Sequence, residues 1–179
     1  NSSNFAISSL ANLKYAYGRY RYFKLANDDI AKLLELLMKL SKSPKINSLN
    51  QSIHSHALRY ARLCYDHIAG KLGVKLKEAL LKSNYIELEN DIFYITELGY
   101  KKFIELGIIK NRFKDIKSLN GAKCYDWSEK EYHIAGKLGY TIATGLIELC
   151  WIKKSLISRE LEVTEVGKVH LYKNFYIKC

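Results

Sequence analysis

Thiol, carboxyl and imidazole side chains occur together at two places in this chain. The two groups share the order cysteine, aspartate, histidine, and their members are Cys64, Asp66, His67, Cys124, Asp126 and His133. Thiolate, carboxylate and imidazole are the ligands that zinc and other borderline metals take. A bound metal ion is therefore one expectation, and a redox switch that uses Cys64 and Cys124 is a second.

The spacing within the two groups differs. Cys64 and His67 are three residues apart and would share one face of a helix, whereas Cys124 and His133 are nine residues apart. The two groups are therefore not expected to present the same geometry. A purely structural interpretation also stands, in which the cysteines are small buried side chains and the aspartates cap helices or pair with histidine.

Cysteine, histidine and aspartate could also form a nucleophilic triad. No glycine-rich elbow or oxyanion-hole signature accompanies them, so the sequence does not indicate an enzyme. The four cysteines include no C-x-x-C pair, which argues against a zinc ribbon and against a disulfide framework. The cysteines are expected to be reduced thiols.

The heptapeptide His-Ile-Ala-Gly-Lys-Leu-Gly occurs at His67 to Gly73 and again at His133 to Gly139, a shift of 66 residues. Matching apolar positions follow both copies, so the C-terminal two thirds of the chain is a tandem of two related units. Two copies are fewer than a solenoid needs, which favours a duplicated small domain. The expected domains are one repeat at 55–110 and a second at 118–179.

Each repeat is predicted to contain a helix, a second helix, a hairpin and a closing helix. In the first repeat the first helix would end at Gly73, the hairpin would turn through Asn90 and Asp91, and Thr96 would cap the closing helix. The predicted fold class is mainly α with short β-hairpins, with winged-helix-like units duplicated in the C-terminal region.

A basic, tyrosine-rich segment runs from Lys14 to Leu25 and predicts two short strands that turn near Gly18. Residues 1–25 contain no acidic side chain. Arg19 and Arg21 would project from one face of this hairpin, where they could reach phosphates or a minor groove. The alternative is a solvated edge hairpin whose charges discourage pairing with another edge.

An amphipathic helix that ends near residues 41–44 is predicted to follow capping oxygens supplied by Asn27, Asp28 and Asp29. Its apolar side chains recur three and four residues apart, at Ile30, Leu33, Leu34 and Leu37. Leu36 and Leu40 widen the apolar arc, which favours packing on a second subunit. Ordinary core packing is the alternative.

The formal net charge of +11 and the pI near 9.4 favour an anionic partner such as nucleic acid. A length of 179 residues, 48% hydrophobic, with one proline, indicates a folded soluble core. No run of eighteen apolar residues and no signal sequence is present. We therefore expect no membrane span, no secretion and a cytoplasmic location.

Three segments resemble ArsR-type winged-helix repressors. The segment from Gly18 to Ala26, with the acidic cap and leucine-rich helix after it, is similar to their wing, G-R-H-R-Y-Y-R-L-A, and dimerisation helix. Arg62 to Gly70 resembles the R-T-C-Y-D-H-L-A-G signature of a long-chain branch of that family. Cys124 to Gly136 resembles its C-L-D-W-S-E-R-x-x-H-L-A-G signature, so the resemblance covers nearly the whole chain.

The resemblance implies a homodimeric repressor that binds double-stranded DNA, with Ile30, Leu33, Leu34 and Leu37 in the dimer interface. Segment 1–45 would be a remnant of the winged helix-turn-helix, in which residues 8–13 form the end of a reading helix. The residues implied to contact DNA are Ser8, Ser9, Asn12, Lys14, Arg19 and Arg21. Family members carry a longer reading unit before the wing, with a histidine that residues 8–13 lack.

The predicted function is therefore a DNA-binding transcriptional repressor that responds to a metal, redox or small-molecule effector through its duplicated C-terminal region. The alternative is a sensory or protein-interaction module that does not bind DNA. The sequence indicates neither the operator nor the effector.

Overall fold

The computed structural model describes residues 11–17, 20–25, 56–110, 115–156 and 158–179, together with the single positions 27, 30, 33, 34, 37, 38 and 40. The chain divides into two compact units, Asn1–Ser43 and Pro44–Cys179, which we call unit 1 and unit 2 and describe separately. None of the helices in the described ranges has the length and apolar character needed to cross a lipid bilayer.

Unit 1 contains an antiparallel hairpin of β1 (Ala11–Tyr17) and β2 (Tyr20–Leu25), in which Tyr17 pairs with Tyr20 next to the turn. This confirms the predicted hairpin. Asn12 lies on β1 and pairs with Lys24. The prediction that residues 8–13 end a helix is therefore wrong for the described part of that segment, because alternating strand pairing continues back to residue 11.

The helix predicted after the hairpin is present at the described positions of unit 1. Asn27 Oδ1 accepts a hydrogen bond from the Ile30 amide at 2.9 Å, which confirms the predicted cap. The described helical positions are Ile30, Leu33, Leu34, Leu37, Met38 and Leu40. The predicted end of the helix near residues 41–44 lies outside the described residues.

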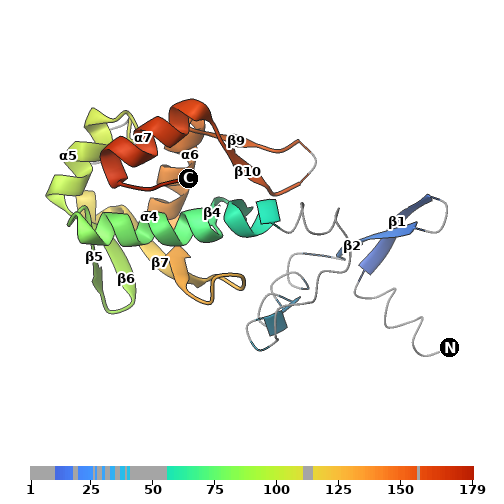
Figure 1. Cartoon of the computed structure of the whole chain (residues 1–179). Helices are drawn as coiled ribbons and strands as arrows, with labels where there is room; N and C mark the ends of the chain where they lie inside the picture. The colour runs from blue at the N-terminus through green and yellow to red at the C-terminus, as the bar shows by residue number, and fades with distance from the viewer. Residues whose placement is uncertain are drawn as a thin grey trace. The chain divides into compact units, whose positions relative to one another are not determined.

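Unit 2 consists of the two repeats, each folded as a β-hairpin, a helix, a second β-hairpin and a second helix (Figure 1). The first repeat contains β3 (Arg62–Cys64), β4 (His67–Ala69), α4 (Lys71–Lys82), β5 (Ile86–Glu89), β6 (Ile92–Ile95) and α5 (Glu97–Glu105). The second contains β7 (Asn120–Tyr125), β8 (Tyr132–Ile134), α6 (Gly136–Glu148), β9 (Ile152–Lys154), β10 (Leu161–Val163) and α7 (Glu165–Phe175). A short 3₁₀ helix, η1 (Ile116–Ser118), precedes β7.

The predicted fold class, mainly α with winged-helix-like units, is wrong, because the described structure is an α+β fold with a four-stranded antiparallel sheet and separate two-stranded sheets. The predicted helix ending at Gly73 is in fact the hairpin β3–β4, and α4 begins only at Lys71. A three-residue strand is too short to show an alternating pattern, so the apolar run around His67 could not be told from a helix. The predicted hairpin turn at Asn90 and Asp91 and the cap at Thr96 are confirmed.

The repeats exchange strand contacts reciprocally. β6 of the first repeat pairs with β7 of the second, which produces the sheet order β5-β6-β7-β8. In return, the Leu63 amide on β3 donates to the Arg159 carbonyl at 2.8 Å, and the Leu161 amide on β10 donates to the Ala61 carbonyl at 3.0 Å. Each repeat therefore supplies strand hydrogen bonds to the other.

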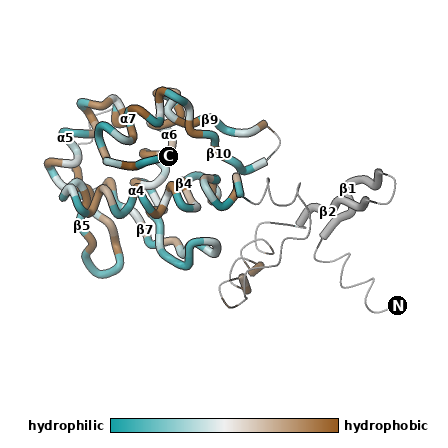
Figure 2. Tube along the Cα trace, in the orientation of Figure 1, coloured by the Kyte–Doolittle hydropathy of each residue, from teal (hydrophilic) through white to brown (hydrophobic). Residues whose placement is uncertain are grey.

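One hydrophobic core runs through both repeats of unit 2. Fully buried leucines from α4, such as Leu72 and Leu80, belong to the same cluster as Leu138 and Leu146 from α6. Figure 2 shows hydrophobic and hydrophilic positions interleaved along the elements of this unit, as expected where each element has one apolar face. The shared core holds the hairpins β3–β4 and β7–β8 in fixed positions.

The caps of the closing helices α5 and α7 lead to a first prediction. Thr96 Oγ1 accepts from the Gly99 amide at 3.0 Å, and Thr164 Oγ1 accepts from the Gly167 amide at 2.9 Å. Replacing either threonine with alanine should lower the free energy of unfolding of unit 2 by about 1 kcal/mol. Urea unfolding followed by tryptophan fluorescence measures this, because Trp127 and Trp151 are the two tryptophans of the chain and both lie in unit 2.

Thr141→Ala is the matched control, because its hydroxyl only donates to the Lys137 carbonyl within α6, at 2.8 Å. The same loss in Thr141→Ala as in the two cap variants would contradict the capping explanation.

Candidate functional site

Two hairpins bring the predicted cysteines and histidines together at the contact between the repeats. Cys64 on β3 pairs directly across the strands with His67 on β4, and Cys124 on β7 pairs with His133 on β8. The expectation that Cys64 and His67 share a helix face is therefore wrong. The expectation of different geometry in the two groups is also wrong, because both are cross-strand pairs.

The two hairpins differ in the length of their turns, which accounts for the different cysteine-to-histidine spacing in the two repeats. Tyr65, with φ of 58°, lies in the two-residue turn between β3 and β4. The longer turn between β7 and β8 is closed by the Asp126 amide, which donates to the Glu131 carbonyl at 2.7 Å. The extra residues of the second repeat thus lengthen a loop and leave the Cys124 and His133 pair in register.

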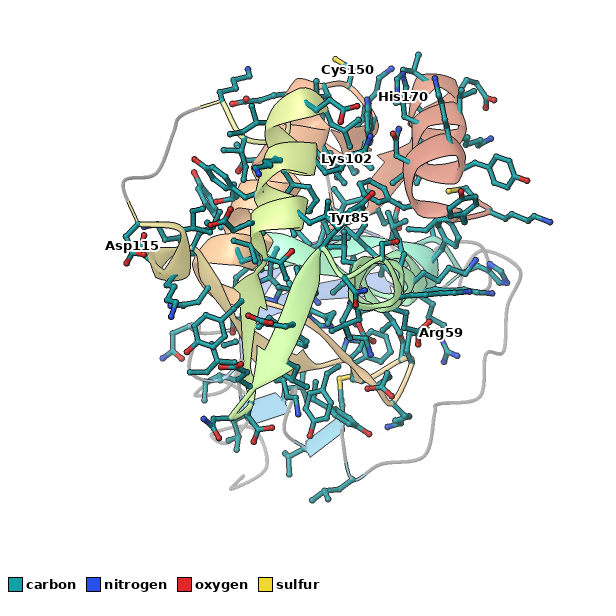
Figure 3. All side chains as sticks on the ribbon, turned by 90° about the vertical axis from the view of Figure 1, so that its left-hand side faces the viewer. Arg59, Tyr85, Lys102, Asp115, Cys150 and His170 are labelled. Atoms are coloured by element: carbon teal, nitrogen blue, oxygen red, sulfur yellow. The ribbon has the colours of Figure 1, made fainter. Side chains whose placement is uncertain are left out.

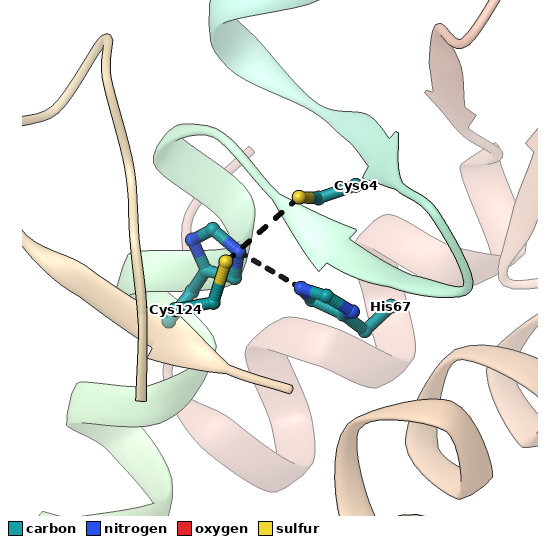
Figure 4. Close-up of side chains that lie close together, drawn as sticks. Cys64, His67 and Cys124 are labelled. Atoms are coloured by element: carbon teal, nitrogen blue, oxygen red, sulfur yellow. Dashed lines mark hydrogen bonds between the residues drawn. The ribbon is translucent and has the colours of Figure 1, made fainter. Parts of the chain in front are cut away.

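The four side chains of these two pairs form a compact cluster, which we call the Cys/His cluster (Figure 4). The sulfur atoms of Cys64 and Cys124 are 3.9 Å apart, and the Nε2 atoms of His67 and His133 are 3.1 Å apart. All four candidate ligand atoms lie within 4.8 Å of one another. Cys64, His67 and His133 are buried, and Cys124 is half-buried.

Each histidine of the cluster has a carboxylate beside its other ring nitrogen. His67 Nδ1 is 3.0 Å from Asp66 Oδ1, and His133 Nδ1 is 3.3 Å from Asp126 Oδ2. The two aspartates therefore face the imidazoles from outside the cluster, as in the structural interpretation that paired aspartate with histidine. Their environments differ, because Asp66 is exposed and Asp126 is completely buried.

Asp126 is the centre of a buried polar network that joins the repeats. Its Oδ1 accepts from Arg62 Nη2 at 2.8 Å, and its Oδ2 accepts from the Gly70 amide at 2.6 Å. The Ser128 amide and hydroxyl also donate to Oδ1, at 2.9 and 2.8 Å. The guanidinium of Arg62 lies over the Trp127 ring, 4.5 Å from its centroid.

Sequence reasoning missed Arg62 and Ser128 as site residues. Both lie inside the two signature segments, Arg62 to Gly70 and Cys124 to Gly136, which the structure places against each other. The available signal was an arginine in a largely apolar segment that also contains a cysteine and a histidine. An arginine that becomes buried in such a segment needs a partner for its charge.

Charges in the cluster depend strongly on their neighbours. Burial opposes ionisation of Asp126, but hydrogen bonds and charges from His133 and Arg62 outweigh it, so the pKa of this carboxyl lies well below its ordinary value. The adjacent Cys124 thiol and burial raise the pKa of Cys64 to about 11. Burial lowers the pKa of His133, but Asp126 and Cys64 outweigh this effect, and the net shift is upward.

The predicted DNA-contact residues belong to unit 1. Asn12 and Lys14 lie on β1, and Arg21 lies on β2 opposite Ala16. Ser8, Ser9 and Arg19 lie outside the described residues.

The predicted dimerisation residues also belong to unit 1, on its helix. Leu33, Leu34 and Leu37 are exposed there, with Leu37 at 54%, and Ile30 is half-buried.

The fold and site together define a two-unit α+β protein whose larger unit encloses a Cys/His cluster between two repeats. The chain is 33% identical over 162 residues to the HTH-type transcriptional regulator YdfF of Bacillus subtilis, and the match covers 90% of this chain and 72% of that protein. The chain belongs to the HTH-type transcriptional regulators. No family model and no solved structure matches it.

Proposed function

We propose that this chain is a DNA-binding transcriptional repressor of the ArsR type that acts as a homodimer in the cytoplasm. The similarity to an HTH-type transcriptional regulator over nine tenths of the chain carries this proposal. The basic hairpin β1–β2 supports it, because lysine and arginine side chains on a hairpin can neutralise DNA phosphates.

In this proposal the helix of unit 1 forms the dimer contact. Leu33, Leu34 and Leu37 present a row of apolar side chains that is exposed in the single chain. A second copy of the same helix would bury that row, and a two-fold dimer matches the two half-sites of an operator.

Unit 2 is the proposed effector-sensing part of the repressor. Its Cys/His cluster joins the two repeats, so a change in the cluster acts on the contact between them.

The test of DNA binding is a double substitution in the hairpin. Arg19→Ala with Arg21→Ala should weaken binding to all DNA sequences by a similar factor, because phosphate contacts carry no sequence information. The slope of log affinity against log salt should become less steep by about 2, since each lost phosphate contact removes about 0.9 from it. Fluorescence anisotropy titrations at two or more salt concentrations measure both quantities.

A charge-matched control removes two exposed lysines of unit 2, in Lys101→Ala with Lys153→Ala. The control should retain the salt slope of the parent. Equal slopes for the arginine variant and the parent would show that the hairpin does not contact phosphates. DNA binding neither by this chain nor by a version with a complete reading unit would favour the alternative, a sensory or protein-interaction module.

A further inference from the structure

We propose that the Cys/His cluster binds one Zn²⁺ ion in tetrahedral coordination, through Cys64 Sγ, His67 Nε2, Cys124 Sγ and His133 Nε2, and that this ion links the two repeats of unit 2. The inference goes beyond the proposed function and does not depend on DNA binding.

Two separations between ligand atoms match edges of a zinc tetrahedron. Bond lengths of about 2.3 Å to sulfur and about 2.05 Å to nitrogen require a sulfur–sulfur edge of about 3.8 Å and a nitrogen–nitrogen edge of about 3.3 Å. The observed separations are 3.9 Å between the sulfur atoms and 3.1 Å between the Nε2 atoms. The sulfur–nitrogen separations are within 4.8 Å, and a zinc tetrahedron requires about 3.6 Å, so side-chain shifts of at most about 1.2 Å bring all four ligands to the ion.

The carboxylates next to the histidines orient their ring nitrogens for a metal. A carboxylate accepts a hydrogen bond from an Nδ1–H group, so Asp66, 3.0 Å from His67 Nδ1, and Asp126, 3.3 Å from His133 Nδ1, favour the tautomer in which Nδ1 carries the hydrogen. The Nε2 lone pairs of the two rings then face each other across 3.1 Å in a buried site. Two facing lone pairs repel each other, and a cation between them removes that repulsion.

The charges of the cluster also suit a divalent cation. Two thiolates and two neutral imidazoles carry a total charge of −2, which one Zn²⁺ neutralises, and the two thiol protons go to solvent on binding. Neutrality matters because the surroundings are buried and an isolated charge there is costly. Asp126 is already paired with Arg62 at 2.8 Å and adds no uncompensated charge.

The ligand set selects the metal and its role. Two sulfur and two nitrogen donors favour zinc over magnesium, calcium or manganese, which take oxygen ligands. Four protein ligands leave no open position for substrate, which is typical of a structural or regulatory zinc site. Each repeat supplies one cysteine and one histidine, so zinc binding stabilises the contact between the repeats.

The test is metal binding by the untagged full chain, kept reduced with a phosphine. Elemental analysis after addition of Zn²⁺ and removal of excess should give one zinc per chain. Co²⁺ should give the visible absorption of tetrahedral cobalt together with a sulfur-to-cobalt charge-transfer band. Zn²⁺ should then displace Co²⁺ and abolish both signals.

Substitutions distinguish the proposed site from other thiols. Cys64→Ser and Cys124→Ser should each lose the tetrahedral cobalt spectrum, whereas Cys150→Ser should keep it. Cys150 is the matched control because it is exposed, on the turn after α6 (Figure 3). Asp66→Asn keeps all four ligands and changes only an exposed side chain, and it should weaken zinc binding about 10- to 100-fold.

Several results would overturn the proposal. These are no zinc or cobalt binding by the reduced parent chain, the same affinity in Cys64→Ser as in the parent, or an octahedral cobalt spectrum. A Cys64 to Cys124 disulfide that persists under the reducing conditions, seen as a loss of two hydrogens by mass spectrometry, would also overturn it. If a ligand variant fails to fold, Asp66→Asn still tests the proposal, because it keeps all four ligands and its exposed side chain is not needed for folding.

Discussion

Asp126→Ala is expected to lower the free energy of unfolding of unit 2 by about 3–5 kcal/mol, because the substitution leaves Arg62 charged and buried without its partner. Arg62 is 2% exposed and Asp126 is 0% exposed, so water cannot replace the lost ion pair. The same substitution removes the acceptor of the Gly70 amide at the start of α4. Chemical unfolding followed by tryptophan fluorescence measures the loss.

The control for this prediction is Asp115→Ala, which removes an exposed carboxylate that caps the short helix η1 through the Lys117 amide. Its effect should be far smaller, because water solvates the amide that it leaves. In a double-mutant cycle, Arg62→Met with Asp126→Ala should cost less than the sum of the two single variants, by about 0.5–3 kcal/mol. Additive losses would mean that Asp126 acts through its backbone contacts and not through Arg62.

The elements with local signals were predictable from the sequence. Asn90 and Asp91 lie between two short apolar segments and both adopt positive φ in the turn between β5 and β6, as a tight hairpin requires. Thr96 was recognisable as a cap because a periodic apolar pattern follows it. Turns and helix caps depend on a few residues that are adjacent in the sequence, so the sequence alone is enough to predict them.

The hairpins β3–β4 and β7–β8 were not predictable because the contacts that hold these short strands come from the other repeat, which is distant in the sequence. β7 pairs with β6 of the other repeat, the Leu63 amide on β3 donates to the Arg159 carbonyl, and the Leu161 amide on β10 donates to the Ala61 carbonyl. Three-residue strands gain their stability from such contacts and not from their own β-propensity. This is also why six chemically suitable residues could be named without foreseeing that four of them converge.

Substituting alanine for Gly73 or Gly139 is the second prediction with a large expected effect. Each glycine lies in the first turn of a helix where that helix crosses its own hairpin. A Cβ at Gly73 would collide with the Ile68 carbonyl oxygen, and a Cβ at Gly139 would collide with the Ile134 carbonyl oxygen. Backbone atoms cannot rotate away, so α4 or α6 must shift from its hairpin.

The expected net loss is up to about 2 kcal/mol in the free energy of unfolding for each substitution, because overpacking costs about 1–3 kcal/mol and the higher helix propensity of alanine offsets about 1 kcal/mol of it. The shift should also move the Cys/His cluster. A Cβ at Gly73 would lie 3.4 Å from the His133 Cβ, and a Cβ at Gly139 would lie 3.1 Å from the His67 Cβ. Each glycine thus supports the histidine of the other repeat, and both variants should bind zinc more weakly than the parent.

Glu78→Ala in α4 provides the comparison, because its side chain is exposed and the substitution changes helix propensity without adding atoms to the core. Its stability and zinc affinity should stay close to those of the parent. If Gly73→Ala and Gly139→Ala instead stabilise unit 2, the two glycines of the repeated heptapeptide do not serve close packing. Reduced stability with unchanged zinc affinity would show that the glycines support the helices without positioning the histidines. The repeated heptapeptide places the histidine and the glycine six residues apart, and the reciprocal contact between repeats is the physical reason we infer for that spacing.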